Sequence, residues 1–290
     1  MDDSDTNDLP AEHVAPPPRT WHLRLAYDGT AFHGWQIQPG QRTVQGQVLE
    51  RLQRFFNAPD LQVSATSRTD AGVHALDQHL SFTVPTPADL DGERLRRLLN
   101  RWLPEDIRVT AADEAPADFK ARYANCGKAY TYSLFHGEKI NPVFARFVWP
   151  LRQRLNLAAM QETAALLVGE RDFASFGVNP KREIESTVCH LFRVQVVPQG
   201  DLVCVSVVGD RFLYKMVRGL VGYLVHVGHG KARPEAVLQV LAACNRAAAA
   251  QSAPAAGLFL ARVFFTAADL QAYEPLVPPF GWDGAADGEG

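Results

Sequence analysis

The feature that most constrains the fold is an alternation of strand patterns and amphipathic helix patterns that runs through the chain twice. In the first half, strands are predicted over residues 21–27, 61–66, 78–84 and 107–111, and helices around residues 44–55, with Thr43 as the N-cap, and 95–102. In the second half, strands are predicted over residues 130–135, 192–197, 202–208 and 258–265, and helices around residues 157–167, with Asn156 as the N-cap, 213–224 and 234–241. Apolar residues that recur every second position predict strands, and those that recur about every 3.6 positions predict helices. The order of these strands and helices along the chain predicts an α+β fold.

Two similar domains follow from this doubling, because 290 residues exceed the roughly 100–200 of a typical domain. We expect them over residues 19–115 and 116–268, each with an antiparallel-rich sheet that carries helices on one face. Sheets joined side by side would form a central cleft. The acidic, Pro-rich residues 1–18 predict a disordered leader, and residues 269–290 a loose tail.

Charge, cysteine content and the absence of known motifs exclude several classes of protein. Net charge is −3, but both predicted tails are acidic and lack Lys and Arg, so residues 19–275 carry about +5. The four cysteines have no zinc-site spacing, and no apolar run approaches the ~20 residues of a membrane span. No nucleotide or dinucleotide motif is present. We expect a cytoplasmic protein without metal, cofactor or membrane contact.

One loop carries candidate chemistry. It follows a predicted strand and reads Ser67-Arg68-Thr69-Asp70-Ala71-Gly72-Val73-His74. In extended backbone Arg68 and Asp70 share a face. By itself this octapeptide favours a surface salt bridge over a catalytic carboxylate.

Three further segments allow two interpretations each. Residues 27–36 crowd glycines, aromatics and an amide, which suits either a turn or a loop that stacks on bases. Tyr130 and Tyr132 share a strand face, as core residues or as a base platform. Arg211, Lys215 and Arg218 are spaced to form a basic stripe on the predicted helix, either a solvated face or a phosphate track.

Taken together and in order, these segments resemble the tRNA pseudouridine synthase A family. The likeness extends from about Trp21 to Phe265. Its motifs are Tyr27-Asp28-Gly29-Thr30, Gly34-Trp35-Gln36, Arg68-Thr69-Asp70-Ala71-Gly72-Val73-His74, Tyr130-Thr131-Tyr132, Asp172-Phe173-Ala174-Ser175-Phe176, Met216-Val217-Arg218 and Ala253-Pro254-Ala255-Ala256-Gly257-Leu258. Ser67 departs from the family, which usually has Gly there.

The resemblance implies an isomerase that converts uridine to pseudouridine at positions 38, 39 and 40 of the tRNA anticodon stem-loop. It implies a homodimer, each tRNA contacting both subunits in an RNA-binding cleft, with neither cofactor nor metal. Asp70 then matches the catalytic nucleophile and Tyr130 the tyrosine that stacks on the target base. Arg68 matches the arginine linked with base flipping, and Arg218 an arginine that pairs with the catalytic carboxylate. Leu258, with Phe259, is expected to form an apolar wall that excludes water.

Two other classes of function remain open at this stage. A module that only binds RNA would not need a carboxylate between two arginines. A hydrolase acting on nucleosides or glycosides would need a second acid beside Asp70, for which Asp77 is the nearest candidate in the sequence.

Overall fold

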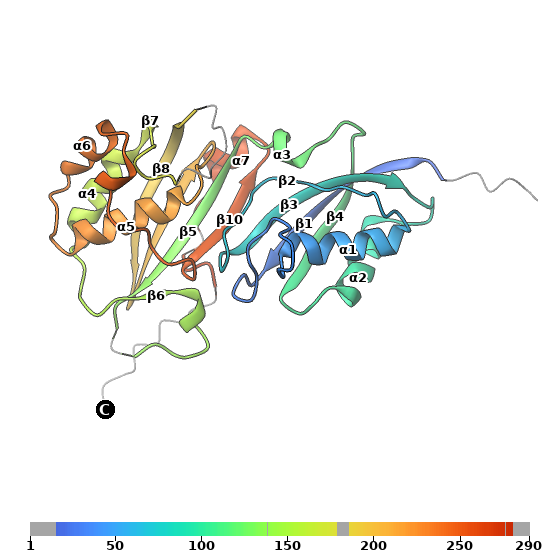
Figure 1. Ribbon diagram of the computed structural model, residues 1–290, viewed down its shortest axis with the longest axis horizontal. Helices are drawn as coiled ribbons and strands as arrows, with labels where there is room; N and C mark the ends of the chain where they lie inside the picture. The colour runs from blue at the N-terminus through green and yellow to red at the C-terminus, as the bar shows by residue number, and fades with distance from the viewer. Residues whose placement is uncertain (1–15, 138, 179–185, 276, 281–290) are drawn as a thin grey trace, which may run out of the picture.

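The computed structural model describes residues 16–137, 139–178, 186–275 and 277–280, and within them the α+β class is confirmed (Figure 1). Ten strands form one mixed, largely antiparallel sheet in the order β4-β1-β3-β10-β5-β9-β8-β7, with β2 on β3 and β6 on β5. Most of the predicted leader, and residues 281–290 of the predicted tail, lie outside the described residues. None of the helices within the described ranges has the length and apolarity to cross a membrane.

The first half of the sheet is built from β1 (Pro18–Tyr27), β2 (Ser64–Ala65), β3 (His74–Pro85) and β4 (Ile107–Ala115). Helices α1 (Val44–Phe56) and α2 (Gly92–Trp102) lie against one face of these strands. Alternate β1 residues Trp21, Leu23 and Leu25 are fully buried and continue into the core formed with these helices. The predicted cap of α1 is confirmed, since the Thr43 side chain accepts a hydrogen bond from the Gly46 amide.

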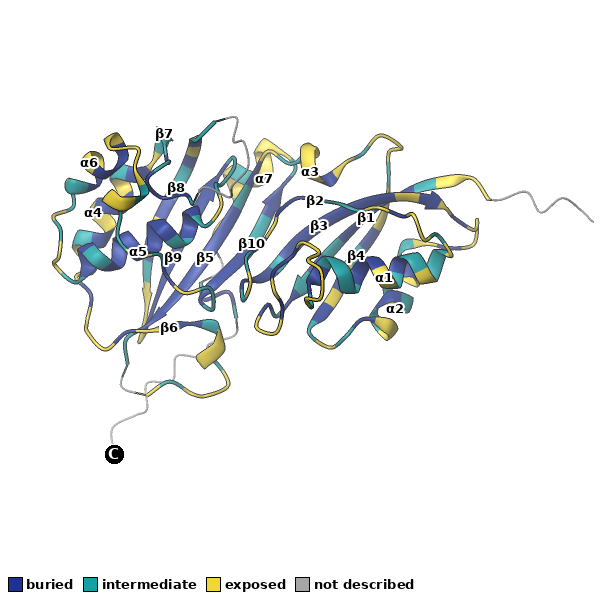
Figure 2. Cartoon of the chain, viewed as in Figure 1, coloured by how far each residue is buried: buried dark blue, intermediate teal, exposed yellow. Residues whose placement is uncertain are grey.

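The second half contributes α3 (Ala121–Ala124), β5 (Gly127–Phe135), β6 (Trp149–Pro150), α4 (Leu157–Leu167) and β7 (Gly169–Asp172). It continues with β8 (Val188–Gln199), β9 (Leu202–Gly209), α5 (Met216–Gly228), α6 (Ala236–Ala242), β10 (Leu258–Phe264) and α7 (Ala267–Ala272). Asn156 caps α4 as predicted, accepting from the Ala159 amide. Figure 2 shows α5 as largely buried, in keeping with its position over the sheet.

The two halves meet at β10, which is last of the strands in sequence yet lies between β3 and β5. It pairs with β5 antiparallel along most of its length. With β3 it pairs in parallel at only two positions, Phe259 with His74 and Leu260 with Ala75. The sheet is therefore continuous across the boundary expected near residue 115, while the division into two domains there stays a prediction.

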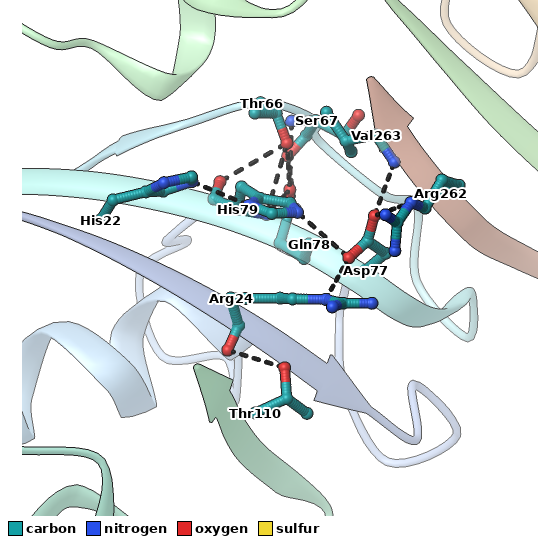
Figure 3. A network of polar contacts seen from close by, with 10 residues as sticks. All are labelled: His22, Arg24, Thr66, Ser67, Asp77, Gln78, His79, Thr110, Arg262 and Val263. Carbon is teal, nitrogen blue, oxygen red and sulfur yellow. Dashed lines mark hydrogen bonds and ion pairs between the residues drawn. The ribbon is translucent and has the colours of Figure 1, made fainter. Parts of the chain in front are cut away.

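Polar side chains reinforce this narrow junction (Figure 3). Asp77 of β3 is buried and forms ion pairs with Arg24 of β1 and, at 3.7 Å, with Arg262 of β10. Its carboxylate also accepts from the Val263 amide at 2.7 Å and contacts His79 at 3.1 Å. Burial pushes the pKa of Asp77 upward, but the hydrogen bond from His79 and the nearby positive charges outweigh it and hold the pKa below its usual range.

One element begins later than predicted. The helix expected over residues 213–224 starts at Met216, and Lys215 before it has φ 60°, in the left-handed region. Upstream, the Asp210 side chain accepts from the Arg211 and His190 amides, and the Val178 amide donates to the Tyr214 carbonyl. These bonds outside the helix hold residues 210–214 in a loop. The helical stripe of Arg211, Lys215 and Arg218 was therefore a wrong prediction.

Candidate active site

A cavity of about 650 Å³ opens over the junction and is lined by both halves of the chain. We call it the central cavity. All five residues singled out from the sequence line it: Arg68, Asp70, Tyr130, Arg218 and Leu258. They come from the loop before β3, from β5, from α5 and from β10, so the fold brings together residues up to 190 positions apart in the sequence.

Asp70 and Arg218 form an ion pair across the cavity. Asp70 Oδ2 lies 2.9 Å from Arg218 Nη1, and the two side chains are 11% and 16% exposed. Arg218 Nε donates to the Ala253 carbonyl at 2.8 Å, which fixes the guanidinium so that one edge faces Asp70. A charge-assisted pair of this kind, largely shielded from water, holds a carboxylate in one orientation.

Tyr130 forms the wall beside this pair. It is 9% exposed, its ring meets Phe212 edge-on at 5.1 Å, and its hydroxyl donates to Ser67 Oγ at 3.4 Å. Burial raises the pKa of Tyr130 to about 12, so the phenol is neutral at physiological pH. Ser67, the position where the sequence departs from the family that it resembles, thus accepts a hydrogen bond from the Tyr130 hydroxyl.

The segment at residues 27–36 supports the Asp70 loop from behind. Tyr27 Oη lies 2.8 Å from Thr69 Oγ1, and the Trp35 amide donates to the Thr69 carbonyl at 3.0 Å. Gly34 has φ +87°, and a Cβ there would lie 2.7 Å from the same carbonyl. Trp35 is 2% exposed and packs in the core, so its ring is not one that this segment can offer to a base. This segment packs against the loop and positions it.

Two of the other motifs hold α5, and through it Arg218. Gly219 packs against the backbone of Phe176, where an added Cβ would lie 2.4 Å from the carbonyl oxygen. The Ala253 amide donates to the Arg218 carbonyl at 2.9 Å. The motifs at residues 172–176 and 253–258 therefore act on the site through contacts with the helix backbone.

Positive charge dominates the central cavity. Among the described residues that line it, the cations are Arg68, Arg122, Lys128, Arg211, Lys215 and Arg218, whereas Asp70 is the only carboxylate. Arg211 and Lys215 reach the cavity from the loop before α5 and not from a helical stripe. Neither Arg122 nor Lys128 was predicted as a site residue. Lys128 lies outside the strand predicted over residues 130–135, but β5 begins at Gly127, so Lys128 and Tyr130 share a strand face.

The side chains expected near Asp70 do not all lie there. Leu258 lines the cavity, but Phe259 does not: it stacks on His74 at 4.6 Å and contacts Phe147, because successive strand residues point to opposite faces. Asp77 does not line it either, being buried in the ion pairs of Figure 3. A hydrolase that pairs Asp70 with Asp77 therefore lacks its second acid. Within the described ranges, no three His, Cys, Asp or Glu side chains cluster as metal ligands.

Comparison with known proteins identifies the family of this chain. A model of the tRNA pseudouridine synthase family matches residues 25–124 and 163–266. The chain is 42% identical to tRNA pseudouridine synthase A of Geobacillus kaustophilus over 242 residues, which cover 83% of this chain and 92% of the relative. It is 41% identical to the Geobacter sulfurreducens protein of that name, over 85% of this chain and all of the relative. It is 39% identical to tRNA pseudouridine synthase A of Chlamydia trachomatis serovar A, over 90% of this chain and 93% of the relative.

The chain belongs to the tRNA pseudouridine synthase family, a family of isomerases.

Proposed function

We propose that this protein isomerises uridine to pseudouridine at positions 38, 39 and 40 of the tRNA anticodon stem-loop, with Asp70 as the nucleophile. The observation that carries the proposal is one shielded carboxylate, paired with Arg218 and flanked by Tyr130, in a cavity where the other charged residues of the described lining are Lys and Arg. A polyanion is attracted to such a cavity, and the single carboxylate supplies a reactive group where a base is held.

The reaction breaks the C1′–N1 bond of the uridine and forms a C1′–C5 bond to the same base. C5 loses its proton to water and N1 takes one up, so the product is an isomer of the substrate. Atoms and electrons balance without an oxidant, a phosphate donor or a net water. The Asp70 carboxylate attacks either the sugar or the base, or it stabilises a glycal-type path. All three routes use an ionised carboxylate, and the guanidinium of Arg218 pairs with it at 2.9 Å.

The substrate base must leave its stack in the RNA, at a cost of a few kcal/mol. We assign this step to Arg68, an exposed residue at the edge of the central cavity. Tyr130 then stacks on the extracted base, and Leu258 limits water beside it. Limiting water favours recombination of the detached base with the sugar over its loss.

Three wider statements belong to the same proposal. The two halves act as two domains whose junction is the RNA-binding cleft, consistent with a central cavity that both halves line. The enzyme works as a homodimer in which each tRNA contacts both subunits; this statement rests on the resemblance to the family. It is cytoplasmic, consistent with four cysteines that all remain free thiols.

The test is the Asp70→Asn variant, assayed on a tRNA transcript by pseudouridine-specific chemical mapping. We expect a loss of at least about 10³-fold in rate, because the amide cannot act as the nucleophile. Binding of the tRNA should largely survive, since the cationic lining is unchanged. Asp60→Asn, in an exposed position outside the cavity, is the matched control.

The rivals predict other outcomes of the same assay. A hydrolase would release free uracil, and an RNA-binding module would leave uridine intact with the wild-type protein. Turnover by Asp70→Asn close to that of wild type would refute the role of Asp70.

A further inference from the structure

A second cavity of about 400 Å³ adjoins the first. We call it the side cavity. It lies between β2, β3 and the segment around α3, and four residues line both cavities: Gln36, Ala65, Arg68 and Arg122. A chain that leaves the central cavity past Arg68 and Arg122 therefore enters the side cavity directly. Nothing in the chemistry proposed for Asp70 uses this space.

The charge of the side cavity is of one sign. Its charged lining residues are Arg68, Lys120 and Arg122, and the described residues that line it include neither Asp nor Glu. In a chain of net charge −3, three cations without a lining carboxylate mark a place for an anion. The same sign continues into the central cavity, so the two spaces together form a path for a polyanion.

An exposed aromatic ring completes the side cavity. Tyr123, on the short helix α3, is 72% exposed, and the Arg122 guanidinium lies 5.4 Å from its ring centroid. Figure 2 shows α3 as largely exposed. A single exposed aromatic needs no explanation by itself. Beside cations and a cavity it matches the combination that binds single-stranded nucleic acid, in which bases stack on aromatics and the backbone follows positive charge.

Amide side chains supply polar groups at the same place. Gln36 and Gln62 line the side cavity, and both residues are exposed. An amide presents both a donor and an acceptor, and can therefore hydrogen-bond the edge of an unstacked base.

We infer that the side cavity binds the nucleotides next to the target uridine on one side of it, as unpaired RNA. Tyr123 stacks on a base there, and Lys120 and Arg122 contact the phosphates. Arg68, at the boundary of the two cavities, separates the target nucleotide from this neighbour. The inference rests on the proposed function, because it places a uridine of the RNA at Asp70.

The first experiment measures the dissociation constant of a tRNA transcript for Tyr123→Ala, Tyr123→Phe and Lys120→Ala. We expect Tyr123→Ala to raise Kd about tenfold, the size of one lost base stack, and Tyr123→Phe to retain wild-type affinity. Lys120→Ala should lower the slope of log Kd against log salt concentration by about 0.7, as for one lost contact to a single strand. The matched controls are Trp102→Ala and Arg101→Ala, whose residues line neither cavity.

A second experiment does not depend on the folding of any variant. A stem-loop RNA carrying 4-thiouridine immediately 5′ or immediately 3′ of the target is photocrosslinked to the wild-type protein. We expect one of the two RNAs to crosslink to the peptide that contains residues 116–124. Unchanged affinity of folded Tyr123→Ala and Lys120→Ala, or crosslinks of both RNAs only outside the side cavity, would overturn the inference. Pseudouridine formation by the wild type in the same preparation would show that the proposed function stands regardless.

Discussion

At the scale of single residues, Lys128 is a side chain whose charge depends on its surroundings. It lies on β5 beside Tyr130 and lines the central cavity. Burial lowers the pKa of Lys128 to about 8, opposed in part by the negative charge of Asp210. Below pH 8 the ammonium is charged and attracts phosphate, and above pH 8 the amine is neutral. Its contribution to RNA binding is therefore present at low pH and lost as the pH rises.

We expect the affinity of the wild-type protein for tRNA to fall between pH 7 and pH 9.5. The reason is that one phosphate contact disappears as Lys128 deprotonates, an effect of roughly 3- to 10-fold on Kd at moderate salt. The measurement is a filter-binding titration at constant ionic strength.

Lys128→Arg is the matched variant, because a guanidinium stays charged throughout this range. It should bind with little dependence on pH, while Lys128→Met should bind more weakly at pH 7 and also lose the dependence. Equal pH profiles for wild type and Lys128→Arg would contradict the assignment.

At the scale of elements, helix α5 transmits packing contacts to the site. Its residue Gly219 touches the Phe176 backbone, and the adjacent Arg218 holds Asp70. A methyl group at position 219 would lie 2.4 Å from a carbonyl oxygen, and a backbone group cannot rotate away. The helix itself must move, and Arg218 moves with it.

The Gly219→Ala variant is therefore expected to lose both stability and activity. Overpacking of this kind costs about 1–3 kcal/mol, which thermal or urea unfolding measures, and pseudouridine formation should fall further than the folded fraction does. Gly46→Ala, in α1, is the control: its nearest obstacle is the rotatable Thr43 hydroxyl, and α1 contributes no residue to the central cavity. Full activity of folded Gly219→Ala would show that α5 adjusts without displacing Arg218.

Elements defined by local chemistry were predictable from the sequence. Thr43 and Asn156 were recognised as caps because short polar side chains before an apolar period bond the first free amides. The start of α5 was not predictable from the sequence. The hydrogen bonds that hold residues 210–214 in a loop involve His190 and Val178, which are remote in the sequence. The strand β2 was predicted over six residues but pairs over two, since pairing depends on β3.

The residues of the candidate site also divide into those that the sequence predicts and those that only the fold reveals. Arg68, Asp70, Tyr130, Arg218 and Leu258 were found through the resemblance of their motifs, and the structure places all five around one cavity. Arg122 carries no local signal, and only the fold brings it near Asp70. The supporting role of residues 27–36 could not be predicted either. It depends on the burial of Trp35 in the core, which the residue type alone does not reveal.

At the scale of the whole molecule, the buried polar network of Figure 3 links strands of both halves. His22 belongs to this network, and its Nε2 lies 2.8 Å from Nδ1 of His79. The acids near His22 are Asp77 and Asp113. Burial, together with the neighbouring His79, lowers the pKa of His22 to about 4. Unfolding restores it to about 6.5. Between these values the unfolded chain binds a proton that the native protein does not, so stability falls as the pH drops from 6.5 to 4.

Between pH 7 and pH 4.5, we expect the free energy of unfolding of the wild type to fall by about 1–2 kcal/mol more than that of His22→Gln. This difference is smaller than the full pKa shift would give, because the His22 ring is partly exposed to solvent. Urea unfolding at the two pH values measures it. His33→Gln, in an exposed loop, should follow the wild type. Parallel losses for wild type and His22→Gln would show that His22 does not contribute.

The position of β10 has a consequence for biosynthesis. Translation completes residues 18–115 and β5 long before residues 258–264, yet only this late strand joins β3 to β5. Until it leaves the ribosome, β5 lacks its partner on the inward edge and β3 lacks it at His74 and Ala75, and unpaired edges are where chains aggregate. The same strand carries Leu258 into the central cavity. A nascent chain thus assembles the complete site only near the end of its synthesis, and a ribosome stalled before residue 258 leaves a fragment that calls for a chaperone.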